Sequence, residues 1–297
     1  MSGELNYLLQ LFVSGLSVGS VYAVIGIGFV VIYKATKILN FAHGEILMIA
    51  AYFCLVLIES LHVHFLIAFF LTLALCAVIG LMVERFIFRP MIGEPVFAVV
   101  MITLGLSIIL RPLTGMVFGF GNVMFPSPFP QKPIVFSNVV ISYAHLWTFI
   151  ISCAVMAIFF LFFKYSKMGI AMRAAADRQI VAFLMGINVK KIFSLSWAIA
   201  AATAGIAGIL LANVMVMNLN LSFVAVKVFP AIILGGLDSI VGALIGGLII
   251  GVFETLVGGY LDLYLSGIKE ISAYILLFII LIVRPYGLFG TEEIERV

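Results

Sequence analysis

Long runs of apolar residues without a single charge constrain this chain more than any other feature of its sequence. Two such runs extend from Phe12 to Ile32 and from Ile192 to Val226. A helix that crosses the hydrocarbon core of a bilayer needs about 20 predominantly apolar residues. The strands of a membrane β-barrel alternate apolar and polar residues instead. The runs therefore predict spanning helices, which satisfy their backbone hydrogen bonds internally.

The overall composition excludes several other classes of protein. Apolar residues make up 65% of the chain and charged residues only 10%, against about 45–50% and about 25% in soluble domains. A net charge of +3 without a basic run argues against nucleic-acid binding. The three cysteines are odd in number and show no Cys-x-x-Cys spacing, so neither a disulfide framework nor a metal site is expected.

The charge-poor stretches predict an all-α, polytopic helical bundle with about 8–9 membrane helices. The run from Leu5 to Tyr33 is too long for the apolar region of a signal peptide, so we expect a retained first span. The two stretches within 223–258 are short and glycine-rich, which leaves open a broken or re-entrant pair. The expected spans are 7–33, 38–58, 65–83, 96–118, 145–163, 193–216, 223–237, 239–258 and 271–284.

The distribution of lysine and arginine predicts the orientation of the spans, because cytoplasmic loops are enriched in these residues. The loop 164–192 carries six basic residues and one acid, Asp177. Counting back through the spans places Lys34, Lys37, Arg85 and Arg89 on the same, cytoplasmic side. The segment 121–144, with four of the nine prolines, then lies on the periplasmic side, and its prolines favour extended chain.

The loop 164–192 contains one predicted helix, from Ala171 to Leu184, with Gly186 at the position of a C-terminal cap. Small and apolar residues fall on one face of this helix at intervals of three or four. Two interpretations remain open: a cationic helix on anionic lipid headgroups, or a coupling helix that docks on a cytoplasmic ATPase. The residues of this face are Met172, Ala175, Ala176, Gln179 and Phe183.

The segment from Asn40 to Glu45 predicts a break between the first two helices. Asn40 is a favourable N-cap for the helix that follows. His43 and Glu45 are either solvated at the interface or buried beside a cavity, where ionisable groups in membranes usually serve function. In the second case we expect these two side chains to be oriented by each other or by a partner subunit. Gly44 would let a neighbouring backbone approach closely.

No catalytic constellation is visible, and no phosphate-binding loop of the Gly-x-x-x-x-Gly-Lys type occurs. The chain is therefore not expected to be an enzyme or to hold a metal, and any ATP would be hydrolysed by another polypeptide. A secondary transporter or channel is the alternative class. A proton-coupled transporter needs proton-carrying groups within the membrane. Few candidate carboxylates occur here, namely Glu45, Glu254 and Asp238, which counts against this class.

Several motifs resemble the permease subunits of ABC importers for branched-chain amino acids, a family of hydrophobic amino acid carriers. The resemblance covers nearly the whole chain and is strongest to the first of the two permeases of such importers. The motifs are Gly19-Ser20-Val21-Tyr22-Ala23, Asn40-Phe41-Ala42-His43-Gly44-Glu45, Gly169-Ile170-Ala171-Met172-Arg173-Ala174 with Gly186-Ile187-Asn188, and Leu234-Gly235-Gly236-Leu237-Asp238-Ser239.

The resemblance implies a single permease domain over 1–297 in the bacterial inner membrane, paired with a second permease. Two cytoplasmic ATPases carrying ATP and Mg²⁺, and a periplasmic solute-binding protein, complete such an importer. We expect the translocation path of the solute to pass Asn40, His43, Gly44 and Glu45. The ATPase contact would involve Arg173, Ala174, Ala175, Ala176, Asp177 and Gly186.

The resemblance leaves two points open. The general importer pattern Glu-Ala-Ala-x-x-x-Gly is degenerate here, because Arg173-Ala174-Ala175 lacks a glycine at the expected distance. The solute also stays undetermined, since related importers carry urea, amides or aromatic acids as well as branched-chain amino acids.

Overall fold

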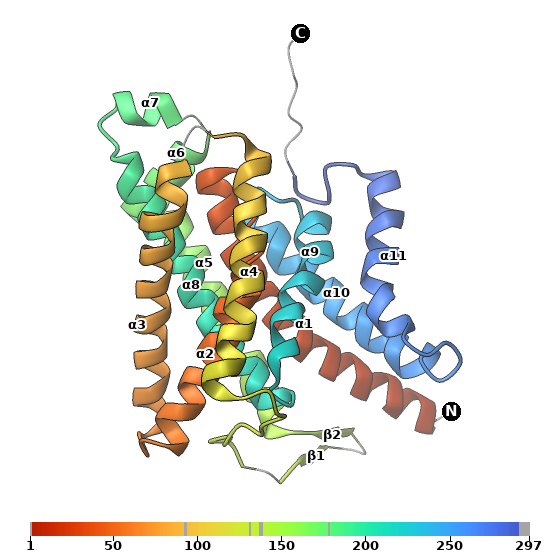
Figure 1. Ribbon diagram of the computed structural model, residues 1–297. Helices are drawn as coiled ribbons and strands as arrows, with labels where there is room; N and C mark the ends of the chain where they lie inside the picture. Colours follow the sequence, from red (N-terminus) through yellow and green to blue (C-terminus); the bar gives the residue numbers. More distant parts are fainter. Residues whose placement is uncertain (1, 92–93, 131, 137–138, 178, 291–297) are drawn as a thin grey trace. The chain divides into compact units, whose positions relative to one another are not determined.

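The computed structural model describes residues 2–91, 94–130, 132–136, 139–177 and 179–290, and most of these residues are helical. Figure 1 shows the elements in chain order. The membrane-type helices are α1 (Ser2–Thr36), α2 (His43–Glu59), α3 (Phe65–Val83), α4 (Val96–Phe118), α5 (Tyr143–Tyr165), α8 (Val189–Val214), α9 (Phe223–Gly235), α10 (Ile240–Leu261) and α11 (Ile268–Val283). The shorter elements are η1 (Glu84–Phe88), η2 (Arg89–Met91), α6 (Lys167–Asp177), α7 (Gln179–Leu184), η3 (Leu219–Ser222) and the strands β1 (Ile134–Phe136) and β2 (Val139–Ile141).

Each predicted span corresponds to one helix, so the prediction of a polytopic helical bundle is confirmed. Six helices of the described part of the chain are long and apolar enough to cross a membrane. The helices α2, α9 and α11 are shorter, with 17, 13 and 16 residues. At about 1.5 Å per residue, α9 covers only about two thirds of a hydrocarbon core of about 30 Å.

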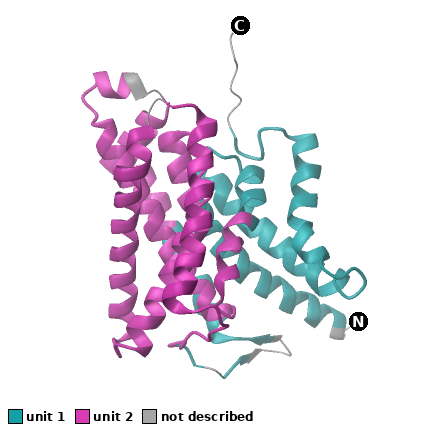
Figure 2. Cartoon of the chain, in the orientation of Figure 1, with its two compact units in different colours: residues 1–26, 129–156, 227–297 teal, residues 27–128, 157–226 magenta. Residues whose placement is uncertain are grey.

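The helices divide into two compact units, which Figure 2 distinguishes by colour. Unit 1 comprises residues 1–26, 129–156 and 227–297, and unit 2 comprises 27–128 and 157–226. The prediction of a single permease domain stays a prediction. Because α1, α5 and α9 contain the boundaries between the units, each of these helices contributes residues to both.

Unit 2 is built around α8, which packs against both α2 and α3. Glycines allow these close approaches: a Cβ atom on Gly80 of α3 would lie 2.5 Å from the Trp197 carbonyl oxygen of α8. Trp197 is fully buried and stacks on Phe88, with ring centroids 4.2 Å apart. Apolar aromatic burial of this kind fixes the positions of the helices that carry the polar residues described below.

Unit 1 contains the contact between the small-residue faces of α1 and α10. A Cβ atom on Gly19 would lie 2.9 Å from both the Gly247 oxygen and the Leu248 Cα atom. These glycines therefore let the backbones of α1 and α10 approach closely. Between α9 and α10, Gly236 has a φ of +103°, which favours glycine. The amide of Leu288 donates to the carbonyl oxygen of Leu234 at 2.8 Å, so the segment after α11 closes this turn.

The proline-rich segment 121–144 contains no helix before Tyr143 in its described residues, as its prolines predict. Its strands β1 and β2 pair antiparallel in unit 1, with Ile134 opposite Ile141. Its first residues belong to unit 2, where the amide of Val123 donates to the carbonyl oxygen of Met217 at 2.9 Å. This bridge holds residues 121–128 at the end of unit 2 where α8 finishes.

Candidate functional site

The predicted break between α1 and α2 is present, and local backbone chemistry explains it. Lys37 ends α1 in the left-handed conformation, with a φ of +58° and its amide bonded to the Tyr33 oxygen. The Asn40 side chain then accepts a hydrogen bond from the amide of Ala42 at 3.1 Å. The helix α2 begins at His43, with Ala42 at the N-cap and no side-chain capping bond. The prediction that Asn40 is the N-cap is therefore wrong by two residues: its side chain closes the turn before the helix.

The first residues of α2 are buried within unit 2. His43 is 0% exposed and lies against Phe29, with ring centroids 4.5 Å apart. Neither ring nitrogen of His43 has a hydrogen-bond partner among the described residues. A Cβ atom on Gly44 would fall far inside contact distance of the Ser222 carbonyl oxygen. Gly44 therefore lets α2 approach the chain at the start of α9, which confirms the close backbone contact predicted there.

Glu45 is neutralised by Arg111 of α4, a residue that the sequence analysis did not select. Arg111 Nη2 donates to Glu45 Oε1 at 2.9 Å, and the Glu45 side chain is only 2% exposed. The Arg111 guanidinium also lies over the ring of Phe223, 3.8 Å from its centroid. The expectation that His43 or a partner subunit orients Glu45 is thus corrected. A sequence signal existed, because Arg111 is the one charged residue within the apolar stretch 96–118.

This site can bind polar groups but shows no arrangement for covalent catalysis. The Glu45–Arg111 pair is neutral overall, and buried unpaired donors lie near it along the chain: Asn40 Nδ2 and Arg111 Nε have no partner among the described residues. Buried polar groups in proteins are normally satisfied by protein, water or ligand atoms. The start of α2 also presents the positive end of a helix dipole. Such a place suits water or a zwitterion better than a single charge.

The predicted coupling segment forms two helices, α6 and α7, where the sequence predicted one from Ala171 to Leu184. Within this segment, Arg178 lies outside the described residues. Met172 and Ala175 are buried within unit 2, where α6 packs on α8. These two residues therefore cannot face a partner protein, which corrects the predicted docking face. Arg173, Ala174 and Asp177 are exposed, and Ala176 is half-buried.

The end of α7 is the most exposed apolar part of this segment. Val181, Phe183, Leu184 and Met185 are 48%, 67%, 76% and 79% exposed. Gly186 follows with a φ of +83°, and its amide donates to the Phe183 oxygen at 3.0 Å. The predicted C-terminal cap at Gly186 is confirmed. We call Val181, Phe183, Leu184 and Met185 the α7 apolar tip.

The three basic clusters gather at one end of unit 2, as the count of spans predicts. Arg89 Nη2 donates to Ser194 Oγ of α8 at 2.8 Å, which places the start of η2 beside the start of α8. Thr36 and Ile38, which flank Lys37, line the same cavity as Arg89. Residues 121–128, the part of the segment 121–144 that belongs to unit 2, lie at the opposite end of this unit from the basic clusters (Figure 2).

We expect Leu184→Cys to be labelled from the cytoplasm only, because the basic end of unit 2 should face inward. The test uses an impermeant thiol reagent on spheroplasts, with and without permeabilisation, in a chain whose three native cysteines are replaced by alanine. Met124→Cys, 80% exposed at the other end of unit 2, is the matched control and should be labelled in intact spheroplasts. Labelling of Leu184→Cys from outside would reverse the predicted orientation.

A second group of polar and charged side chains lies in unit 1, around Glu254, a carboxylate that the sequence analysis named without its partners. Tyr22 donates to Glu254 Oε2 at 2.8 Å, and Lys227 Nζ lies 3.9 Å from Glu254 Oε1. Lys227 also forms an ion pair with Glu270 of α11. The four residues come from four helices, α1, α9, α10 and α11. These contacts link the four helices, and a hydropathy profile does not reveal them.

Comparisons with known proteins agree with this architecture. The family described as branched-chain amino acid transport system / permease component matches residues 11–284. The chain is 34% identical to the high-affinity branched-chain amino acid transport system permease protein LivH of Salmonella typhimurium, over 100% of both chains. It is 33% identical to the high-affinity branched-chain amino acid transport system permease protein BraD of Pseudomonas aeruginosa, over 99% of both chains.

A solved structure, PsaBC from Streptococcus pneumoniae in complex with Fab, shares the fold of this chain. Its TM-score is 0.50 at 15% sequence identity, and the match covers 94% of this chain and 92% of that one. At this identity the likeness concerns the fold alone.

Proposed function

The chain belongs to the family of permease components of branched-chain amino acid transport systems, and we propose that it forms half of the membrane path of an ATP-driven importer. The other half is a second permease subunit. The solutes are branched-chain or related hydrophobic amino acids, which is supported by the full-length similarity to the branched-chain amino acid permeases LivH and BraD. The importer resides in the bacterial inner membrane.

The buried Glu45–Arg111 pair beside the helix break carries this proposal. Charged residues within membrane-spanning segments almost always face a bundle interior or a water-filled cavity. A broken helix at membrane depth is tolerated where it is buried in protein or lines such a cavity. A zwitterionic amino acid must pass without being trapped, and a neutralised pair attracts neither its ammonium nor its carboxylate strongly. Asn40, His43, Gly44 and Glu45, with Arg111 added, would form this part of the path.

The partners of the importer would attach at the two ends of unit 2. The α7 apolar tip offers exposed Phe183, Leu184 and Met185 to a cytoplasmic ATPase. Arg173, Ala174, Ala176 and Asp177 flank that contact, while Ala175 supports it from within. Two such ATPases would bind ATP and Mg²⁺. A periplasmic solute-binding protein would meet the segment 121–144.

We expect Leu184→Asp to uncouple ATP hydrolysis from uptake while leaving membrane insertion intact. Full burial of a leucine side chain contributes about 1.5–3 kcal/mol, so its loss should weaken the ATPase contact about tenfold or more. The measurement is leucine uptake and ATPase activity of the reconstituted complex of both permeases, ATPases and binding protein. Leu61→Asp is the control, because Leu61 is 63% exposed in the turn after α2 and lies outside both proposed partner contacts.

Two results would contradict the proposal. Leucine uptake by the permeases without the ATPases would indicate a secondary transporter or channel. Suppose instead that the complete importer takes up urea, amides or aromatic acids and not leucine. The assignment as an ATP-driven permease would then stand, and the assignment of the solute would be wrong.

A further inference from the structure

A cavity of about 160 Å³ opens into unit 2 at the end that carries the basic clusters. It lies between the start of α8, the η1 and η2 turns that follow α3, and the beginning of α4. The chain just after α1 closes another side, through Thr36 and Ile38. The proposed path through Asn40 and Glu45 does not use this cavity. Its principal lining residues are Glu84, Phe88, Arg89, Glu94, Val96 and Trp197.

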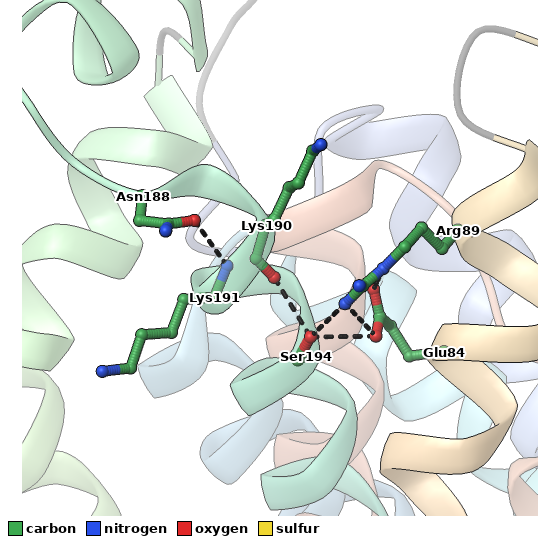
Figure 3. Close-up of polar contacts among 6 residues, drawn as sticks. All are labelled: Glu84, Arg89, Asn188, Lys190, Lys191 and Ser194. Carbon is green, nitrogen blue, oxygen red and sulfur yellow. Dashed lines mark hydrogen bonds and ion pairs between the residues drawn. The ribbon is translucent and has the colours of Figure 1, made fainter.

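The polar wall of the cavity is built around a buried carboxylate. Figure 3 shows Glu84, Arg89 and Ser194 pointing toward one another. Arg89 donates to Glu84 through Nε at 3.1 Å and through Nη2 at 2.9 Å, and Ser194 donates to Glu84 Oε2 at 2.9 Å. The π-helical turn of η1 lies between Glu84 and Arg89, and such turns often occur at functional sites. The network holds the guanidinium in one orientation.

Another part of the cavity lining is apolar and buried. Phe88 and Trp197 stack at 4.2 Å, and both are buried. Val99 of α4 is 2% exposed and lines the cavity beside them. A cavity of about 150 Å³ with apolar walls is large enough to hold benzene. A branched aliphatic side chain therefore fits against this wall.

Two charged groups at the cavity remain available to a ligand. The Nη1 atom of Arg89 donates to no described residue, and the Arg89 side chain is 37% exposed. Glu94 is exposed, and its carboxylate pairs with no described residue. Glu84 and Arg89 neutralise each other, so Glu94 leaves the lining with one negative charge in excess. An ammonium group would balance that charge.

We propose that this cavity binds a hydrophobic α-amino acid at the ATPase-facing end of the permease. The carboxylate of the ligand would accept from Arg89 Nη1, its ammonium would pair with Glu94, and its side chain would lie on Phe88 and Trp197. This inference rests on the proposed function, which supplies hydrophobic amino acids as solutes. It adds a binding site on the side of release, separate from the residues at the start of α2.

The test measures binding of labelled leucine to the purified complex of both permeases and ATPases, without the binding protein, by equilibrium dialysis. We expect saturable binding that Val96→Trp abolishes at this site, because Val96 lines the cavity mouth and is 61% exposed. Phe97→Trp is the matched control, since Phe97 is 73% exposed and does not line the cavity. Substitution of Arg89 is avoided because it would leave Glu84 buried and unpaired.

Glu94→Gln separates ligand recognition from structure. Exposed ion pairs contribute about 0.2–1 kcal/mol, so leucine affinity should fall about threefold. Binding of 4-methylpentanoate, which lacks the ammonium group, should not fall, because Glu94 attracts only the ammonium. Glu59→Gln, an exposed carboxylate at the far end of α2, should alter neither.

Three results would overturn the inference. The first two are no leucine binding to the wild-type complex and unchanged leucine binding in Val96→Trp. The third is binding of labelled phosphoethanolamine that Val96→Trp abolishes and that unlabelled leucine does not reduce, which would assign the cavity to a lipid headgroup. Leucine uptake by the same preparation with its binding protein separates this failure from that of the proposed function. If uptake persists without binding at the cavity, only the inference fails.

Discussion

Replacing Arg111 by methionine is expected to abolish uptake and to cost about 3 kcal/mol in the free energy of unfolding. The reason is that Glu45, 2% exposed, would be left as an uncompensated charge in the interior of unit 2. Removal of one partner from a buried ion pair typically costs about 3–5 kcal/mol. We use the lower end because the Arg111 side chain is 26% exposed. The thermal unfolding midpoint in detergent and leucine uptake by the reconstituted importer measure the two effects.

The double variant Glu45→Gln/Arg111→Met distinguishes stability from transport. It removes both charges, so most of the lost stability should return. If uptake stays low while stability returns, the charges act on the solute path; if both return, the pair is structural. Arg85→Met, at an exposed arginine after α3, is the control and should change neither quantity. Normal uptake and stability in Arg111→Met alone would show that the pair contributes to neither.

Replacing Gly44 by alanine is expected to reduce uptake severely, because even one methyl group has no room. The added Cβ would overlap the Ser222 carbonyl oxygen and lie 3.0 Å from the Ala225 Cβ atom. Overpacking typically costs about 1–3 kcal/mol, and here it would push α2 away from the start of α9. Because Glu45 and Phe223 lie at this contact, the shift would also disturb the Arg111 pair. Uptake is measured against the amount of inserted protein.

Gly105→Ala is the matched control, since a Cβ atom there meets nothing within 4 Å and should be tolerated. Gly44→Leu should be at least as harmful as Gly44→Ala. Asn40→Leu should also reduce uptake more than His43→Gln does, because Asn40 closes the turn before α2. Full transport by inserted Gly44→Leu would show that the close contact is dispensable and that the break is an ordinary surface turn.

The sequence predicted the helices well because the signal for a membrane span is local. Each span is a continuous stretch whose transfer into lipid depends on its own side chains. The end of a helix was equally predictable where the backbone requires one residue type, as at Gly186 with its positive φ. The prediction of the start of α2 was less accurate. The Asn40 side chain can accept from several nearby amides, and in the structure it accepts from that of Ala42.

The docking face of the segment 164–192 shows where a local pattern misleads. Met172 and Ala175 fall at helical spacing with Ala176 and Phe183, and the sequence alone places them on one face. The helix ends at Asp177, and the face that carries Met172 and Ala175 turns inward onto α8. Apolar residues of similar size serve a protein core and a protein interface alike, so only tertiary contacts tell the two apart.

By itself, the sequence determined that this protein is a polytopic helical membrane protein, where its helices lie, which loops share a side, and where the first two helices break. Only the tertiary structure decided which charges neutralise each other. Glu45 and Arg111 are 66 residues apart in the chain, and Glu84 and Ser194 are 110 apart. Hydropathy and spacing describe a residue and its neighbours along the chain. Burial of a charge depends on a partner that arrives from another helix, and that partner is set by how the helices pack.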